Sequence, residues 1–141
     1  MGCDIHSIVQ TRNSDGSWST VPSQFYDDRS YGLFALLADV RNYSEVPTIH
    51  KRRGLPDDIV NQLENDDEID GVWLGDHSFT WYTLDELLDF NYKQRFVDKR
   101  EFGNPDCAIE DIIPDDYFSI LEELKKLGDP KNTRIVMGFD N

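Results

Sequence analysis

A chain of 141 residues with 38% hydrophobic and 12% aromatic residues can bury a core, which argues against disorder and favours a single domain over residues 1–141. No apolar run approaches the roughly 20 residues of a membrane span, and no signal-peptide pattern opens the chain, so we expect a cytoplasmic protein without membrane contact. The formal net charge of −14 disfavours direct nucleic-acid binding, because repulsion replaces counterion release.

Two strands joined by a tight turn are expected at the N-terminus. Residues 3–12 alternate between two faces, as a strand does. Residues 13–17 include an Asp-Gly pair, which favours a turn because glycine adopts positive φ without strain. Residues 18–21 then return as a second strand that Pro22 ends. The pattern predicts a β-hairpin.

A buried helix and a shorter one are expected next. The first begins near Ser30, with Asp28 as its cap. Its apolar positions recur with helical spacing at Leu33, Leu36, Leu37 and Val40. Residues 42–55 have loop composition, and Pro56 suits the first turn of a short helix that runs to about Glu64.

The second half begins with extended segments. Residues 71–74 and 79–82 predict short strands, and Thr83 with Glu86 forms a capping box that opens a helix. Residues 91–113 have weak periodicity and predict no element.

A strong helix and a last strand close the chain. Apolar residues over 117–127 follow helical spacing, and Gly128 suits the end of that helix. Residues 133–140 predict a strand with one apolar face, formed by Ile135, Met137 and Phe139. This face and that of the first strand need a common core. We therefore predict an α+β fold with a small mixed or antiparallel sheet that includes the first and last strands as neighbours, packed by three to four helices.

Asp4 and His6 stand two residues apart on the first strand, so both side chains lie on one face. A carboxylate and an imidazole there can share a divalent metal ion, or the carboxylate can orient the imidazole for proton transfer. Asp140, at the end of the neighbouring last strand, would complete a set of metal ligands. The alternative is a hydrogen-bonded surface pair.

Two further polar segments are candidates for binding. Gly75 to Ser78 is a glycine turn followed by His77 and Ser78, which suits a binding loop, although an ordinary turn is the alternative. His50 and the basic run of residues 51–53 could grip phosphate, because arginine matches phosphate oxygens in two-pronged hydrogen bonds. The alternative is charge balance against the neighbouring acidic helix.

The cysteines and the acidic runs have plain interpretations. Cys3 and Cys107 match no disulfide or zinc pattern, and Cys3 shares a face with Ile5, which favours a buried thiol over a nucleophile. The acidic runs at residues 57–70 and 101–123 favour solubility. They could also imitate a nucleic-acid backbone and occupy a basic partner.

Several sequence blocks carry a resemblance to a known family. They are residues 1–6 (Met-Gly-Cys-Asp-Ile-His), 29–42, 53–58, 77–84 and 134–141. The chain resembles a family of small phage and prophage proteins without an established activity. Members often carry a second histidine where this chain has Phe79. The phenylalanine here weakens the prediction of a histidine-rich metal site. The blocks contain polar residues at ends of elements, which is how pocket linings are distributed. The resemblance thus implies a ligand-binding set of Arg29, Tyr31, Arg41, Arg53, His77, Ser78 and Trp81.

Three functions remain open, because no complete catalytic signature occurs. The first is a phage-type pocket protein that binds a phosphorylated small molecule, a nucleotide above all, to sequester a host defence signal; arginines would hold phosphate, and Tyr31 or Trp81 would stack on a base. The second is a metal-dependent phosphodiesterase that uses Asp4, His6, His77 and Asp140. The third is an acidic interaction protein that inhibits a host nucleic-acid-binding enzyme. A host protein and a second copy of the chain remain open as partners.

Overall fold

A four-stranded sheet with strand order β2-β1-β8-β5 forms the centre of the computed structural model, which describes residues 2–61, 68–100 and 104–141. All its neighbouring strands are antiparallel. The strands are β1 (Asp4–Arg12), β2 (Trp18–Val21), β5 (His77–Thr83) and β8 (Thr133–Asp140). The predicted hairpin of the first two strands is confirmed.

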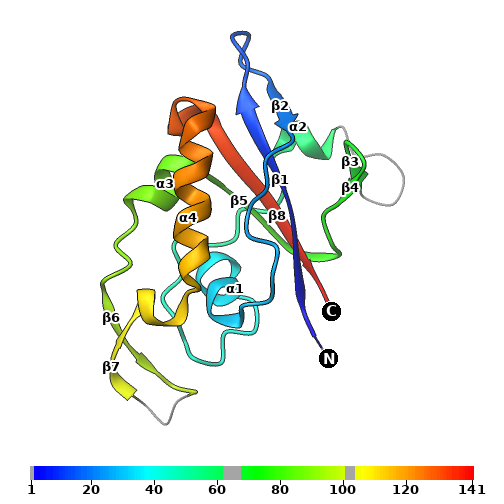
Figure 1. The fold of residues 1–141 in the computed structure, drawn as a ribbon. Coiled ribbons are helices and arrows are strands. Elements are labelled where there is room, and N and C mark those ends of the chain that lie inside the picture. The colour runs from blue at the N-terminus through cyan, green and yellow to red at the C-terminus, as the bar shows by residue number, and fades with distance from the viewer. Residues whose placement is uncertain (1, 62–67, 101–103) are drawn as a thin grey trace.

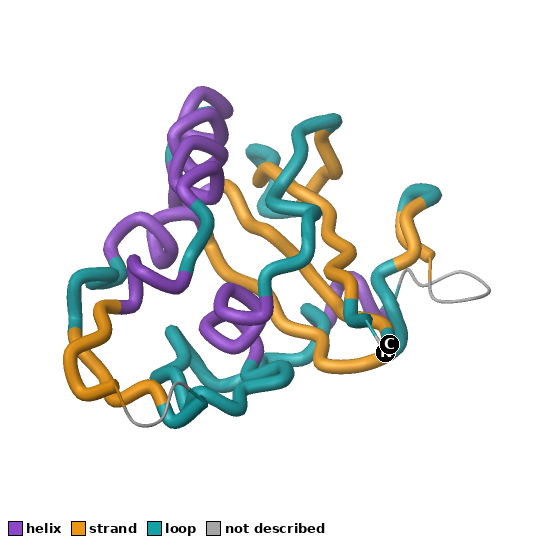
Figure 2. The backbone as a smooth tube through the Cα atoms, turned by 60° about the horizontal axis from the view of Figure 1, so that its bottom comes forward, coloured by secondary structure: helices purple, strands orange, loops and turns teal. Residues whose placement is uncertain are grey.

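The first and last strands are neighbours, as the sequence predicts. Their register runs from Asp4 opposite Asp140 to Thr11 opposite Thr133. The two chain ends therefore lie side by side at one end of the sheet (Figures 1 and 2). This pairing brings together polar residues that are more than a hundred positions apart in the sequence.

Three helices cover one face of the sheet (Figure 1). They are α1 (Tyr31–Ala38), α3 (Leu84–Asp89) and α4 (Asp115–Leu124). Ile5, Ile135 and Phe139 are buried against them, and the Phe34 and Phe139 rings meet edge to face at 5.2 Å. Each such fully buried side chain stabilises the fold by about 1.5–3 kcal/mol relative to its exposed state.

The N-terminal cap of α1 differs from the prediction. Ser30, not Asp28, is the capping residue: its hydroxyl accepts a hydrogen bond from the Leu33 N–H at 3.3 Å. Asp28 instead accepts from the Arg29 N–H at 2.8 Å, outside the helix. Ser30 caps the helix because it immediately precedes the first helical residue and has extended backbone, as a cap requires.

The other face of the sheet is also covered. The short α2 (Asp57–Val60) and the hairpin of β3 (Glu68–Ile69) with β4 (Val72–Trp73) pack on a second core of Ile8, Ile59, Ile69, Leu74 and Val136. Because both faces are covered, every residue from Thr133 to Phe139 is buried. The predicted extension of α2 to Glu64 lies outside the described residues.

The unassigned region forms a second small hairpin. Its strands are β6 (Arg95–Asp98) and β7 (Asn104–Ala108), followed by the 3₁₀ turn η2 (Ile109–Ile112). The remaining short turns are η3 (Lys125–Leu127) and η4 (Pro130–Asn132). The hydroxyls of Tyr92 and Tyr117 lie 2.7 Å apart and tie this region to α4.

None of the helices in the described part of the chain is both long and apolar enough to cross a membrane.

Both cysteines are buried, and no disulfide joins them. Burial raises the pKa of the Cys3 thiol, and the nearby Arg41 opposes this shift only in part. We expect both thiols to react with a disulfide reagent at pH 8 about 100-fold more slowly in the native protein than in denaturant, because the thiolate must be exposed to attack. Absorbance of the released thiol measures this. Rapid labelling of the native protein would contradict the buried placement.

Candidate functional site

A hollow of about 430 Å³ lies where the loop after α1 meets the start of β5 and the C-terminus. Its lining residues are Asp39, Val40, Arg41, Asn42, Tyr43, Arg52, His77, Ser78 and Asn141. The hollow thus unites three of the residues that the sequence predicts as ligand-binding: Arg41, His77 and Ser78. Separate parts of the chain contribute to it, as in most small-molecule sites.

A braced loop positions Arg41 in this hollow. Asn42 donates to the Asp39 carboxylate at 2.8 Å and to the Val46 carbonyl at 2.9 Å, and it accepts from the Val46 N–H. These bonds hold a loop in which both Asp39 and Arg41 have positive φ, an uncommon backbone state for these residues. The Arg41 guanidinium lies 5.5 Å from the centre of the Tyr31 ring. Tyr31 therefore supports an arginine rather than presenting an open face in the hollow.

A bulge at the start of β5 positions His77 and Ser78. The pairing with β8 shifts register between His77 and Thr80, and Ser78 has a φ of 60°. Bulges of this kind redirect side chains and are frequent beside functional sites. Gly75 precedes the bulge with a φ of 88°, and a Cβ there would collide with the backbone of Phe139. Only glycine lets this turn lie against β8.

A chain of polar contacts runs along the wall of the hollow. Arg52 donates to the Ser78 hydroxyl at 2.7 Å, and Ser78 lies 2.8 Å from Nδ1 of His77. The other ring nitrogen, Nε2, lies 2.6 Å from Oδ1 of Asn141. With Ser78 donating to Nδ1, the imidazole proton sits on Nε2 and is donated to Asn141. Arg52 thus meets a neutral hydroxyl here, not a carboxylate.

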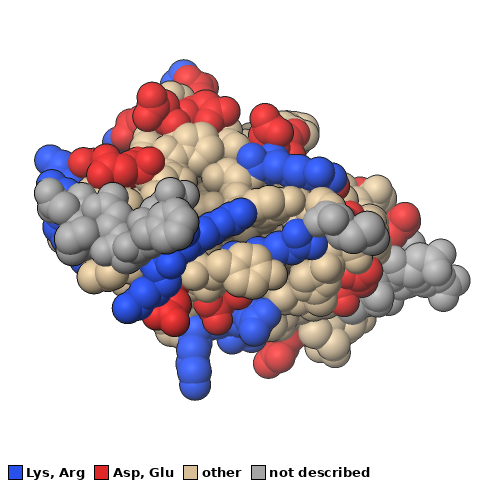
Figure 3. All heavy atoms as spheres, turned by 90° about the horizontal axis from the view of Figure 1, so that it is seen from below, with Lys and Arg blue, Asp and Glu red and all other residues tan. Residues whose placement is uncertain are grey.

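The hollow is basic although the chain is acidic. Among the described side chains that line it, two arginines, Arg41 and Arg52, stand against one carboxylate, Asp39, and the neutral His77 ring adds polar groups. Seen from the end where the chain termini lie, Lys and Arg side chains cross the middle of the molecular face, and Asp and Glu lie mostly around them (Figure 3). With a formal net charge of −14, a local excess of positive charge favours an anionic ligand at this place.

The residues predicted as metal ligands lie at the adjacent end of the sheet. His6 Nε2 and Asp140 Oδ2 are 2.6 Å apart, and the His6 ring lies 4.8 Å from that of Trp73. Asp4 accepts two hydrogen bonds from Arg29, at 2.7 and 3.2 Å, which hold the pKa of its carboxyl below its usual value. Within the ranges that the structure describes, no group of three His, Cys, Asp or Glu is arranged to hold a metal ion. Because its guanidinium is bonded to Asp4, Arg29, which the sequence predicts as ligand-binding, does not line the hollow.

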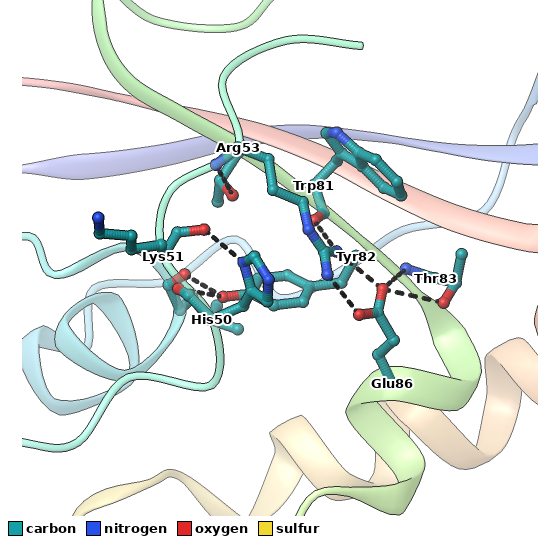
Figure 4. A network of polar contacts seen from close by, with 9 residues as sticks. His50, Lys51, Arg53, Trp81, Tyr82, Thr83 and Glu86 are labelled. Atoms are coloured by element: carbon teal, nitrogen blue, oxygen red, sulfur yellow. Dashed lines mark hydrogen bonds and ion pairs between the residues drawn. The ribbon is translucent and has the colours of Figure 1, made fainter.

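Arg53 and Trp81 also lie apart from the hollow, at the open edge of β5 (Figure 4). The Arg53 guanidinium lies 4.6 Å from the centre of the Trp81 ring and donates to the Trp81 carbonyl at 2.9 Å. It also binds both carboxylate oxygens of Glu86, at 2.8 and 2.5 Å. Lys51, two residues earlier, extends away from this ion pair (Figure 4). Arg53 is therefore engaged with the protein itself.

The predicted ligand-binding set leaves out six of the nine residues that line the hollow: Asp39, Val40, Asn42, Tyr43, Arg52 and Asn141. Arg52 belonged to the basic run, and the pattern offered no reason to prefer it to Arg53. Tyr43 and Asn141 had no sequence signal, because a loop tyrosine and a terminal asparagine are common on surfaces.

Comparison of the chain with protein-family models, with curated proteins and with solved structures found no match.

Proposed function

We propose that the hollow binds the phosphate of a small phosphorylated molecule, with a nucleotide as the ligand class. One observation carries the proposal: two arginines, Arg41 and Arg52, converge with the polar His77 ring from three segments of a strongly acidic chain. Concentrated positive charge in such a chain favours a specific anion over nonspecific attraction.

The chemistry of the lining residues suits a phosphate group. Arginine forks match phosphate oxygens, and hydrogen bonds between charged groups contribute about 1.5–3 kcal/mol each. Arg52 can exchange the neutral Ser78 hydroxyl for a phosphate oxygen without leaving a carboxylate unpaired. Tyr43 lines the hollow and is 67% exposed, so its ring is available to stack on a base. The volume of about 430 Å³ falls in the usual range for small-molecule sites.

The contacts of His77 favour binding over cleavage. Both of its ring nitrogens are engaged, one with Ser78 and the other with Asn141. A general base needs a free ring nitrogen within reach of the proton that it removes. The proposed role is therefore to hold the ligand intact. In the phage-type setting that the sequence resemblance implies, this would sequester a host defence signal.

Titration calorimetry with adenosine and guanosine 5′-diphosphate tests the proposal. Arg41→Ala and Arg52→Ala should each weaken binding about 10- to 100-fold, because each removes a charged hydrogen-bond donor. Lys131→Ala removes an exposed positive charge from η4, outside the hollow, and should leave affinity unchanged. If all three variants weaken binding equally, the loss of affinity comes from the change in net charge and not from the lining of the hollow. Absence of binding by the unaltered protein would overturn the proposal.

A further inference from the structure

A second hollow adjoins the first. It measures about 380 Å³ and is lined by Asp39, Thr48, His50, Lys51 and Arg52. Two of these residues, Asp39 and Arg52, also line the hollow described above. The two hollows therefore meet along a common wall, and Arg52 stands in that wall.

The second hollow has the same kind of charge as the first. Lys51 and Arg52 bring two permanent positive charges, and Thr48 adds a hydroxyl. His50 Nδ1 lies 2.7 Å from the Lys51 carbonyl, which can only accept, so the ring proton of the neutral imidazole sits on Nδ1. Each hollow thus offers basic side chains of its own, Arg41 in the first and Lys51 in the second, and both use Arg52.

Asp39 distinguishes the junction from the two hollows. It is the one carboxylate side chain among the described residues that line either hollow. The Asn42 amide donates to its Oδ1, which keeps the carboxylate at the junction. A negative charge on the ligand would be repelled there, whereas a hydroxyl or amino group could donate to the carboxylate. The junction therefore favours a neutral, hydrogen-bond-donating part of the ligand.

We propose that the two hollows form one site for a ligand with two separate phosphate groups joined through a hydroxyl-bearing sugar. Each phosphate occupies one hollow, Arg52 contacts both, and the sugar lies against Asp39. This inference rests on the proposed function, and it narrows the ligand class to nucleoside bisphosphates and dinucleotides. A nucleoside diphosphate, whose phosphates are adjacent, fits it less well.

Two ligands with the same base and the same number of phosphates test the proposal. Adenosine 3′,5′-bisphosphate should bind the full-length protein at least about 10-fold more tightly than adenosine 5′-diphosphate, because it can use the charged donors of both hollows. Calorimetry at pH 7.5 measures both affinities, and chromatography of the recovered ligand checks that it stays intact.

Variants of the lining residues separate the two hollows. Lys51→Ala should lower the affinity for the bisphosphate about 10-fold and change the affinity for the diphosphate by less than about 2-fold, because Lys51 lines the second hollow alone. Arg41→Ala should weaken both ligands. Asp39→Asn keeps the acceptor for Asn42 and removes the negative charge that repels phosphate. It should therefore strengthen binding of the diphosphate more than binding of the bisphosphate, and so narrow the difference between their affinities. Lys131→Ala is the control for net charge.

The outcomes distinguish this inference from the proposed function. Equal affinity for the two ligands, together with no effect of Lys51→Ala, overturns the two-phosphate site. The single-phosphate hollow stands in that case if Arg41→Ala and Arg52→Ala still weaken the diphosphate. If neither ligand binds, both proposals fall.

Discussion

Replacing Asp58 by alanine is expected to lower the free energy of unfolding by about 3 kcal/mol, because it strands a buried positive charge. The Arg134 side chain is 4% exposed, and its two terminal nitrogens donate to the Asp58 carboxylate at 3.1 and 2.6 Å. Its Nε donates to Gln10 at 2.8 Å, and the Trp18 ring centre lies 4.4 Å from the guanidinium. These neutral partners remain in the variant, but the compensating negative charge is lost.

Urea denaturation followed by tryptophan fluorescence measures this loss. Asp57→Ala is the matched control: Asp57 stands beside Asp58 in the first turn of α2 but is exposed, so its loss should cost less than about 0.5 kcal/mol. Removing both charges, as in the double variant Asp58→Ala with Arg134→Met, should recover part of the stability. Equal stability of the Asp57 and Asp58 variants would show that Arg134 does not depend on this partner.

Replacing Arg53 by alanine is expected to lower the free energy of unfolding by about 2–3 kcal/mol, since it breaks a half-buried ion pair and removes the side-chain contacts that hold this segment against β5 and α3. Besides the contacts of its side chain, its backbone N–H donates to the Thr80 hydroxyl at 3.1 Å, and Gly54 donates to the Phe79 carbonyl at 3.0 Å. This segment therefore occupies edge groups of β5, a strand with no sheet neighbour on that side among the described residues. Without its arginine, the segment loses its main attachment to α3 and β5.

The ion pair also predicts a sensitivity to acid. Hydrogen bonds from Arg53 lower the pKa of Glu86 from 4.5 to about 2. Between these values the unfolded chain binds the proton and the folded chain does not, so stability falls as the pH drops from about 4.5 to about 2. Above this window the stabilisation is fully present. In Arg53→Ala the pKa of Glu86 should return towards its ordinary value, and the acid-dependent loss of stability should shrink.

The neighbouring arginine provides the control. Arg52→Ala breaks an exposed hydrogen bond to Ser78, so it should change stability by less than about 1 kcal/mol while it removes phosphate affinity. Arg53→Ala should do the reverse, provided that affinity is measured below its denaturation midpoint. Chemical denaturation at pH 7 and at pH 3 gives both the stability and its acid dependence. An Arg53 variant as stable as the Arg52 variant would contradict the structural role.

The candidate site was only partly predictable from the sequence. Arg41, His77 and Ser78 were identified because they are polar residues at ends of elements, where pocket linings gather. The predicted ligand-binding set includes Arg53 and not Arg52, yet Arg52 lines the hollow and Arg53 binds Glu86. The two neighbouring side chains thus have different surroundings. Packing decides which side chain meets a sheet edge and which meets a hollow. The local sequence does not specify this choice.

By itself, the sequence determined the elements whose signals are local: the alternation of β1 and β8, the spacing of α4, and the box in which Glu86 accepts from Thr83 at the start of α3. Side-chain periodicity and capping act within a few residues, so they can be identified without knowing the fold. Only the tertiary structure decided that a second layer covers β8, that Asp4 pairs with Arg29, and that Asn141 joins Arg41 and Arg52 in one hollow. These features join residues distant along the chain, and the competition among many carboxylates for few arginines is settled by distance and burial.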